Sequence, residues 1–233
     1  MANRVKPPFF EIGPKAFMYG QDMLALARAA DEISRRYDVR IIMTPQSVDL
    51  RLLAENTTDL LVFAQHMDPI LPGRGLGSVL PEAVKATGAS GVMLNHAECP
   101  MELNALGRAI ARARELGLTS IVCADSLKDA AAIAVYAPDI IVPEPSELIG
   151  TGQSSGTEYI LASIRAVKDV NPDIQVLPAA GIASEEDVYR VIAAGAEATG
   201  CTSAIMKAED PAAMTERMIA AVRRAWDERG GGE

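Results

Sequence analysis

The segment IIVPEPSELIGTG, residues 140–152, is typical of a buried strand that runs into a functional loop. Its first three residues are apolar, and the two prolines end the strand because proline has no backbone N–H for a sheet ladder. Glu144 is therefore expected at the carboxyl end of the strand, with two glycines a few residues beyond it. A single Glu-Pro pair is usually part of a solvated loop, so the functional interpretation depends on the rest of the chain.

Strand-like runs of this kind alternate with helical patterns along the whole chain. The helical patterns have apolar residues at three- and four-residue spacing, and glycine or proline stands at most of the joints. We predict strands at Phe9–Ile12, Val39–Met43, Leu60–Ala64, Gly91–Leu94, Ser120–Cys123, Ile140–Val142, Ile174–Leu177 and Ala198–Cys201. We predict helices at Asp22–Tyr37, Val48–Ala54, Leu80–Thr87, Glu102–Leu116, Leu127–Tyr136, Thr157–Asn171, Glu185–Ala194 and Pro211–Glu228.

This alternation predicts the α/β class and a single (β/α)8 barrel domain over residues 1–233. Strands joined by crossover helices run parallel, and eight such units in 233 residues fit a closed barrel better than an open sheet. No linker or shift in composition marks a second domain. An open doubly wound sheet is the alternative. A dinucleotide-binding version of it needs Gly-x-Gly-x-x-Gly after an early strand, and the glycine-rich segment 73–77 does not fit that motif.

The composition indicates a soluble globular protein, with 49% hydrophobic and 23% charged residues. A formal net charge of −9 repels phosphate backbones, so we expect no nucleic-acid partner. No apolar run approaches the roughly 20 residues of a membrane span, and residues 1–8 are too short and polar for a signal peptide. We therefore expect no membrane association and a location in the cytoplasm.

Histidine and cysteine are sparse and lack the spacing of a metal site. The two histidines fall on different predicted loops, and the three cysteines are an odd number without a ligand motif. We expect reduced thiols at Cys99, Cys123 and Cys201. Neither a metal nor a cofactor is expected.

Chemically capable side chains follow several predicted strands. In a (β/α)8 barrel the active site is built from the loops at the carboxyl ends of the strands. Both histidines of the chain fall in such loops, which is mild evidence alone but stronger when a lysine and a glutamate occupy equivalent places. The residues after strands 1, 3, 4 and 6 are Lys15, Gln65-His66, Asn95-His96-Ala97-Glu98 and Glu144.

Small residues follow strands 6, 7 and 8. Turns of this kind let backbone N–H groups approach a phosphate, the ligand expected after strands 7 and 8 of such barrels. A tight turn that merely needs small residues is an equally good explanation for any one of them. The turns contain Gly150, Thr151 and Gly152, then Ala179, Ala180 and Gly181, then Thr202, Ser203 and Ala204.

Five segments, in order along nearly the whole chain, resemble the triosephosphate isomerase family, specifically its short archaeal form. They are AQHMDP at 64–69, GSVLPEAVK at 77–85, NHAE at 95–98, EPSELIGTG at 144–152, and AGI at 180–182 with EDV at 186–188. The resemblance implies a TIM barrel and an aldose-ketose isomerase of glycolysis and gluconeogenesis. The reaction that the resemblance implies interconverts glyceraldehyde 3-phosphate and dihydroxyacetone phosphate through an enediolate.

The same resemblance implies a role for each matching residue. Glu144 corresponds to the catalytic base, His96 to the electrophilic imidazole, Lys15 to the ammonium beside the substrate oxygens and Glu98 to the carboxylate after the histidine. Gly150 and its neighbours Thr151 and Gly152 belong to a closing loop over the phosphate. The remaining substrate or phosphate contacts are assigned to Gly13, Ala180, Gly181, Thr202, Ser203 and Ala204.

Four positions depart from the family pattern. Gly13 stands for the usual Asn, Leu76 for Thr, Ala97 for Ser, and Cys99-Pro100 for the segment with the usual Arg. Without that Arg, the Glu98 carboxylate is expected either to pair with Lys15 or to change its protonation. Space freed at Gly13 and Ala97 would suit a longer phosphorylated ketose.

Two alternatives follow from these departures. One is an isomerase of a different sugar phosphate, such as a tetrulose phosphate. The other is a catalytically silent barrel that binds phosphosugars. Retention of Lys15, His96 and Glu144 together argues against the silent barrel.

The segment Gln65–Ser78 is long for a βα loop and is rich in apolar residues, among them Met67, Ile70, Leu71 and Leu76. We expect it to dock into a partner subunit. The resemblance implies a homodimer or a homotetramer, with a phosphorylated sugar as the small-molecule partner.

Overall fold

Eight short parallel strands form the centre of the molecule in a computed structural model, which describes residues 4–145 and 156–230. Consecutive strands from β1 to β7 pair with each other, and β1 also pairs with β8, so the sheet curls into a barrel. The (β/α)8 prediction is confirmed over the open sheet. The strands are β1 (Phe9–Ile12), β2 (Arg40–Met43), β3 (Leu61–Ala64), β4 (Gly91–Leu94), β5 (Thr119–Ala124), β6 (Ile140–Pro143), β7 (Gln175–Val176) and β8 (Ala198–Cys201).

The barrel is closed between β7 and β8 by a side chain. The backbone ladder of the described residues runs from β7 through β1 to β8. The Thr199 hydroxyl of β8 donates a 2.7 Å hydrogen bond to the Pro178 carbonyl just after β7. Both residues are buried, so this bond satisfies polar atoms that water cannot reach.

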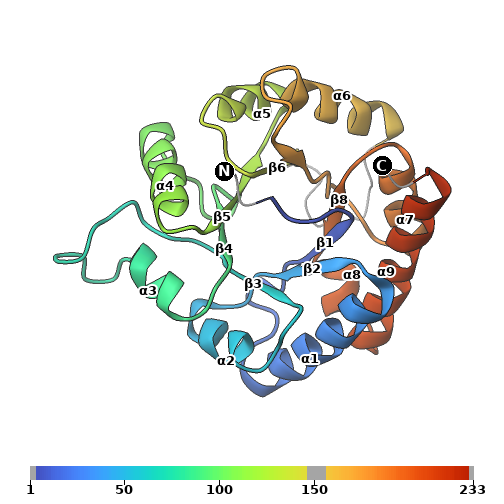
Figure 1. The fold of residues 1–233 in the computed structure, drawn as a ribbon, viewed down its shortest axis with the longest axis horizontal. Coiled ribbons are helices and arrows are strands. Elements are labelled where there is room, and N and C mark those ends of the chain that lie inside the picture. The colour runs from blue at the N-terminus through green and yellow to red at the C-terminus, as the bar shows by residue number, and fades with distance from the viewer. Residues whose placement is uncertain (1–3, 146–155, 231–233) are drawn as a thin grey trace.

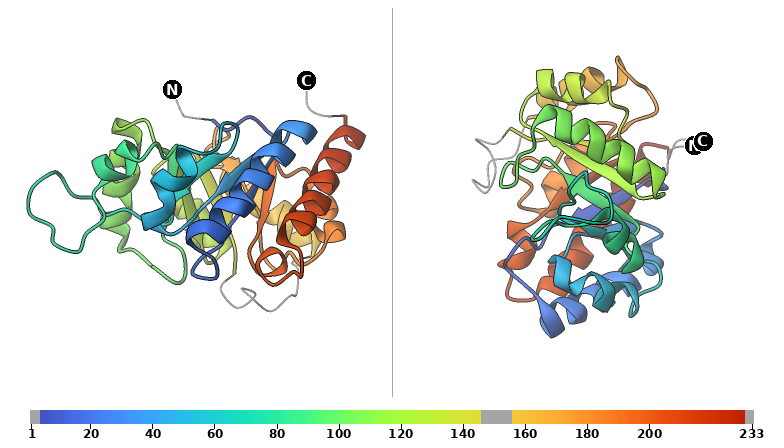
Figure 2. Two further views of the ribbon diagram at one scale, coloured as in Figure 1. Left: turned by 90° about the horizontal axis from the view of Figure 1, so that it is seen from below. Right: turned by 90° about the vertical axis from the view of Figure 1, so that its left-hand side faces the viewer.

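Helices surround the barrel as an outer ring (Figure 1). Figure 2 shows the same ring from two other directions, with the loop after β3 extending away from the body of the molecule. The helical elements are α1 (Gly20–Tyr37), η1 (Ser47–Asp49), α2 (Leu50–Ala54), α3 (Pro81–Ala86), α4 (Leu103–Glu115), α5 (Leu127–Ala134), α6 (Thr157–Lys168), α7 (Glu185–Ala193), α8 (Ser203–Met206) and α9 (Pro211–Glu228).

Most predicted elements occur with ends that differ by a few residues. The predicted helix Val48–Ala54 is a 3-10 turn, η1, followed by α2, and the predicted strand Ile174–Leu177 is shortened to β7. The short helix α8 was not predicted, because Thr202-Ser203-Ala204 was interpreted as a turn. Its single turn offers no apolar repeat for a sequence pattern to reveal.

Two apolar layers result from the alternation of side chains along the strands. The barrel interior is filled by Phe9, Ile42, Phe63, Ile121 and Ile140, among others. Phe10 and Ile12 belong instead to the larger core between strands and helices. Since successive side chains of a strand point to opposite faces, β1 sends residues 9, 11 and 13 inward. Inward residues near the carboxyl end therefore belong to the mouth of the barrel.

The interior packing depends on the absence of a side chain at Gly91. A Cβ at this position would lie 2.4 Å from the Thr119 carbonyl oxygen and 2.5 Å from Cε2 of the Phe63 ring. Both neighbours are buried and belong to the adjacent strands, so neither has room to move.

No helix among the described residues has the length and apolar character that crossing a lipid bilayer requires.

We expect Gly91→Ala to lower the free energy of unfolding by about 3 kcal/mol, because overpacking a filled interior forces strain into backbone and rings. Urea denaturation measures the change. Gly156→Ala is the matched control, since a Cβ there meets nothing within 4 Å; its effect should stay below about 1 kcal/mol. Equal effects of the two substitutions would contradict the packing argument.

Candidate active site

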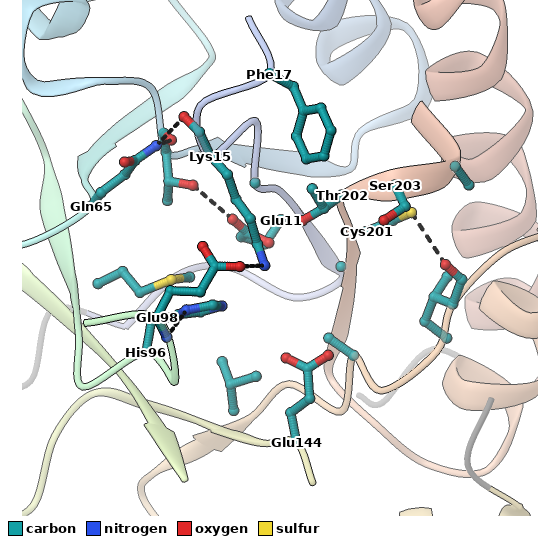
Figure 3. A pocket seen from close by; sticks show the side chains of 18 of the residues that line it. Glu11, Lys15, Phe17, Gln65, His96, Glu98, Glu144, Cys201, Thr202 and Ser203 are labelled. Carbon is teal, nitrogen blue, oxygen red and sulfur yellow. Dashed lines mark hydrogen bonds and ion pairs between the residues drawn. The ribbon is translucent and has the colours of Figure 1, made fainter. Parts of the chain in front are cut away.

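A pocket of about 870 Å³ opens at the carboxyl ends of the strands and is lined by residues that lie in or shortly after each of the eight strands. Lys15, His96, Glu98 and Glu144, which the sequence singled out, all line it. Figure 3 shows Glu98 reaching the end of Lys15, with His96 and Glu144 on nearby sides of the same space. The fold thus brings together residues that are up to 129 positions apart along the chain.

The backbone of Lys15 is held in an unusual conformation. Its φ of 49° lies in the left-handed region, which is costly for a residue with a side chain. Two side-chain amides hold it there: Gln46 Nε2 donates to the Lys15 carbonyl at 2.8 Å, and Gln65 Nε2 donates to the same oxygen at 2.9 Å. Gln65 also donates to the Thr44 carbonyl at 2.8 Å. These bonds from β2 and β3 fix the direction in which the lysine side chain enters the pocket.

Glu98 pairs with the Lys15 ammonium. The distance from Lys15 Nζ to Glu98 Oε1 is 2.7 Å, which confirms the first of the two predicted outcomes for a carboxylate without an arginine partner. The hydrogen bond from Lys15 is the main reason that the pKa of Glu98 lies below its ordinary value, and burial opposes it. Because the Glu98 side chain is well exposed, the pair adds little to stability, and its effect is to orient the ammonium.

The geometry assigns a tautomer to His96. Its Nδ1 accepts a 3.0 Å hydrogen bond from the Glu98 backbone N–H, so in the neutral ring the proton is on Nε2. Burial lowers the pKa of His96, and the positive charge of Lys15 lowers it further. His96 therefore presents a neutral N–H donor to the pocket. The start of this loop is held by Asn95, whose side-chain amide donates to the Cys123 carbonyl at 3.0 Å and accepts from the Met101 N–H at 2.9 Å.

Glu144 stands just beyond β6, as the sequence predicted. Its backbone N–H donates to the Ala124 carbonyl at 2.9 Å, which anchors it to β5. Burial raises the pKa of its carboxyl group, Lys15 opposes that rise, and Asp125 adds to it. Its carboxylate makes no hydrogen bond with any residue that the structure describes. An unpaired carboxylate of raised pKa is well suited to accept a proton from a ligand.

Small residues form the side of the pocket near β7 and β8. Gly181 lines it with a φ of 70°, and Thr202, Ser203 and Ala204 line it at the start of α8. Ala180 was expected here but is buried in the wall, and its neighbour Ala179 lines the pocket instead. Gly150, Thr151 and Gly152 lie outside the described residues.

Glu11 is a lining residue that the sequence analysis missed. It is only 6% exposed, and its Oε1 accepts a 3.0 Å hydrogen bond from the Thr44 hydroxyl. A signal was available: Glu11 is the one charged residue of the strand FFEI, two residues before Gly13, so the two positions share the inward face.

The space at Gly13 is occupied, which corrects the expectation that its missing side chain enlarges the site. A Cβ at Gly13 would lie 3.0 Å from Thr202 Oγ1 and 3.1 Å from Glu11 Oε1. The Glu11 carboxyl group thus fills room that a side chain at position 13 would need. Ala97 is half-buried and is not among the described residues that line the pocket. Neither change opens space for a longer ligand.

His66, the second histidine of the chain, lies outside the described lining of the pocket and contacts other side chains of the protein instead. Its Nε2 is 3.3 Å from Asp68 Oδ1, and its Nδ1 is 3.7 Å from the Cys99 sulfur. In the part of the chain that the structure describes, no three histidine, cysteine or acidic side chains come together as metal ligands.

The segment Gln65–Ser78 carries less exposed apolar surface at its start than the sequence predicted. Met67 is fully buried in the protein's own core, which corrects its predicted place in a docking surface. Leu71 and Leu76 are exposed. The apolar surface available to a partner is therefore at the tip of the loop.

Comparison with known proteins gives consistent similarities. A family model described as triosephosphate isomerase matches residues 15–220. Triosephosphate isomerase of Methanothermus fervidus is 39% identical over 203 residues, which cover 86% of this chain and 91% of that protein. The Sulfurisphaera tokodaii enzyme of the same name is 34% identical over 229 residues, 97% of this chain and 100% of that protein. That of Saccharolobus solfataricus is 36% identical over 226 residues, 95% and 99% of the two chains.

We expect heteronuclear NMR to find His96 neutral at pH 7 and protonated on Nε2. Its ring should gain a second proton only below its ordinary pKa of 6.5, because burial and Lys15 both disfavour the cation. His66→Gln leaves His96 as the only histidine of the chain, which assigns the signals. A proton on Nδ1, or a charged ring at pH 7, would contradict the geometry.

Proposed function

The chain belongs to the triosephosphate isomerase family, and we propose that it interconverts glyceraldehyde 3-phosphate and dihydroxyacetone phosphate through an enediolate. It is then an aldose-ketose isomerase, an intramolecular oxidoreductase. The observation that carries this proposal is the convergence of three groups on one pocket. They are the Glu144 carboxylate, which has no hydrogen-bond partner among the described residues, the Nε2–H of His96 and the ammonium of Lys15.

The proposed reaction moves one proton between adjacent carbons. Glu144 removes a proton from the carbon beside the carbonyl, and the electron pair of that bond moves onto the carbonyl oxygen to give the enediolate. His96 Nε2–H and the Lys15 ammonium donate hydrogen bonds to the two substrate oxygens as charge develops. A second proton passes from the hydroxyl oxygen to the former carbonyl oxygen, with His96 Nε2 placed between them, and Glu144 returns its proton to the neighbouring carbon, which completes the exchange. Triosephosphate isomerases are themselves the standard example of a glutamate base beside a neutral histidine.

A neutral histidine is the better donor for this chemistry in the observed surroundings. A cationic His96 next to the Lys15 ammonium would place two like charges in a partly buried site, which the lowered pKa of the histidine avoids. The fixed tautomer means that no proton has to be rearranged before substrate binds. Glu98 contributes in the proposal by orienting Lys15, since it contacts the ammonium from the exposed side.

The phosphate group is assigned to the side of the pocket formed by Gly181 and the segment Thr202–Ala204. Support comes from the small residues there, whose backbone can approach an anion closely, and from the Gly181 φ of 70°. Gly150, Thr151 and Gly152 remain proposed phosphate contacts of a closing loop on the strength of the family pattern. Gly13 contributes backbone alone to the site in this proposal.

No observation favours the two alternative functions. A longer ketose phosphate would need the space expected at Gly13, and Glu11 and Thr202 fill that space. A silent binding protein has no need of an unpaired base, a neutral donor and an oriented ammonium in one pocket.

Oligomer formation, location and pathway are parts of the same proposal. We assign the tip of the Gln65–Ser78 loop, with Leu71 and Leu76, to the contact in a homodimer or homotetramer, because exposed apolar side chains on a projecting loop favour burial by a partner. A cytoplasmic location fits cysteines that remain free thiols. The reaction itself belongs to glycolysis and gluconeogenesis.

We expect Glu144→Gln to lower kcat on glyceraldehyde 3-phosphate by about 10²–10⁴-fold, because the amide cannot accept the proton. A coupled assay with each triose phosphate, beside tetrulose and pentulose phosphates, measures this. Glu115→Gln, on the exposed face of α4, is the matched control and should keep wild-type turnover. Turnover of a longer ketose phosphate without turnover of the trioses would contradict the proposal.

We expect Leu76→Asp to weaken subunit association at least about tenfold, since a charge placed at a buried apolar contact is costly. Sedimentation velocity over a range of concentrations gives the dissociation constant. Val170→Asp, an exposed apolar residue after α6, should leave association unchanged. If both variants associate like the wild type, the loop tip is not the contact.

A further inference from the structure

Glu11 is a buried carboxylate that lines the pocket, whereas Asp31 and Asp49 lie outside its described lining and tie structural elements together. Asp31 accepts hydrogen bonds from the N–H groups of Thr58, Asp59 and Leu60, and so ties α1 to the start of β3. Asp49 likewise accepts from the N–H of Gly20. Glu11 has the Thr44 hydroxyl on Oε1, and its Oε2 makes no hydrogen bond with the described residues. Because Glu11 lines the pocket, this oxygen is available to a ligand bound there.

Two glycines make room for this carboxyl group. A Cβ at Gly200 would lie 3.0 Å from Glu11 Oε2, and a Cβ at Gly13 would lie 3.1 Å from Oε1. These are the neighbouring inward positions on β8 and on the end of β1. Both glycines line the pocket together with Glu11 and Thr44. The floor of the site is therefore shaped around the Glu11 carboxyl group.

The position of a proton on Glu11 follows from its one hydrogen bond. Because the Thr44 hydroxyl donates to Oε1, the neutral carboxyl group carries its proton on Oε2. Oε2 is then a hydrogen-bond donor in the pocket that His96 and Lys15 also line. Figure 3 shows Glu11 near the end of the Lys15 side chain, with Thr202 beside it.

The surroundings of Glu11 favour its neutral form. Burial raises its pKa to about 7; the Thr44 hydrogen bond opposes the rise, the charge of Glu144 adds to it, and Lys15 opposes it. The other titratable groups that face it are the thiols of Cys123 and Cys201, whose own pKa values are raised and which are uncharged near pH 7. The carboxyl group thus changes its charge near neutral pH.

We propose that Glu11 is a further substrate-binding catalytic residue, whose neutral carboxyl group donates a hydrogen bond from Oε2 to the substrate oxygen on which negative charge develops. This inference rests on the proposed function, and it names one more group for the same site. The substrate class is a phosphorylated α-hydroxy carbonyl compound. Position 13 offers no polar side chain, and the residue two positions earlier on the same face supplies the donor instead.

The test compares Glu11→Gln and Glu11→Leu with the wild type in kcat and kcat/KM on glyceraldehyde 3-phosphate from pH 6 to pH 9. Wild-type kcat/KM should fall at least about tenfold above pH 7, as ionisation removes the donor. Glu11→Gln keeps an N–H donor at every pH, so this fall should disappear. Glu11→Leu should lose about 10²–10³-fold in kcat at all pH values, the usual cost of removing one oxyanion donor.

Gln175→Leu is the matched control for removing a buried polar side chain from the barrel interior. Gln175 exchanges hydrogen bonds with the backbone of Val5 at the other end of the barrel, at 3.0 Å and 2.9 Å. Gln175→Leu should lower the melting temperature of the protein without changing the pH profile of kcat/KM. The inference is overturned if Glu11→Leu keeps a folded protein with kcat within about threefold of wild type, or if Glu11→Gln retains the alkaline fall.

Binding separates this inference from the proposed function. Calorimetric titration of dihydroxyacetone phosphate into Glu144→Gln, and into Glu144→Gln with Glu11→Leu, needs no turnover. At pH 6.5 we expect the second substitution to weaken binding at least about tenfold, the effect of leaving one polar group of the ligand without its hydrogen-bond partner in an enclosed site. An inactive wild type whose binding still depends on Glu11 would refute the proposed function alone. Binding that is independent of Glu11 would refute this inference.

Discussion

The pairing of β1 with both β2 and β8 is the constraint on which the rest of the molecule depends. It curls the parallel ladder into a barrel, so the carboxyl ends of all strands meet around one opening. A side chain at the end of any strand then faces the same small volume. β1 itself provides Glu11 and Gly13 on its inward face and Lys15 directly after it. Breaking this pairing would separate Lys15 from Glu98 and Glu144.

The electrostatics of the pocket are organised around one ammonium group. Lys15 is held in a left-handed backbone conformation by amides from two neighbouring strands, and its side chain meets Glu98. Burial lowers the pKa of His96, and the charge of Lys15 lowers it further. The same charge opposes the rise in the pKa values of the buried carboxyl groups Glu11 and Glu144. Groups of unequal proton affinity in one enclosed space are what a proton transfer requires.

The departures from the family pattern have a common physical consequence at the floor of the site. Glycine at position 13 removes a side chain, and Glu11 and Thr202 occupy the space where it would begin. The site is therefore rebuilt in its polar contacts, and its size is kept. Loss of an arginine after Glu98 is met by the direct ion pair with Lys15. In our proposal the substitutions change which groups hold the substrate oxygens, while Glu144 and His96 act as base and electrophile.

Much of this protein follows from local sequence. The period of apolar residues sets the strands and helices, and the fixed alternation of parallel units sets the barrel, so Lys15, His96 and Glu144 are predictable at strand ends. The resemblance to a family supplied their roles. Only the tertiary structure decided what happens between elements. It places the Glu11 carboxyl group in the space beside Gly13, buries Ala180 and Met67, and leaves His66 outside the described lining of the pocket. These outcomes depend on contacts between distant strands, and local pattern carries no information about which side chains those contacts bring together.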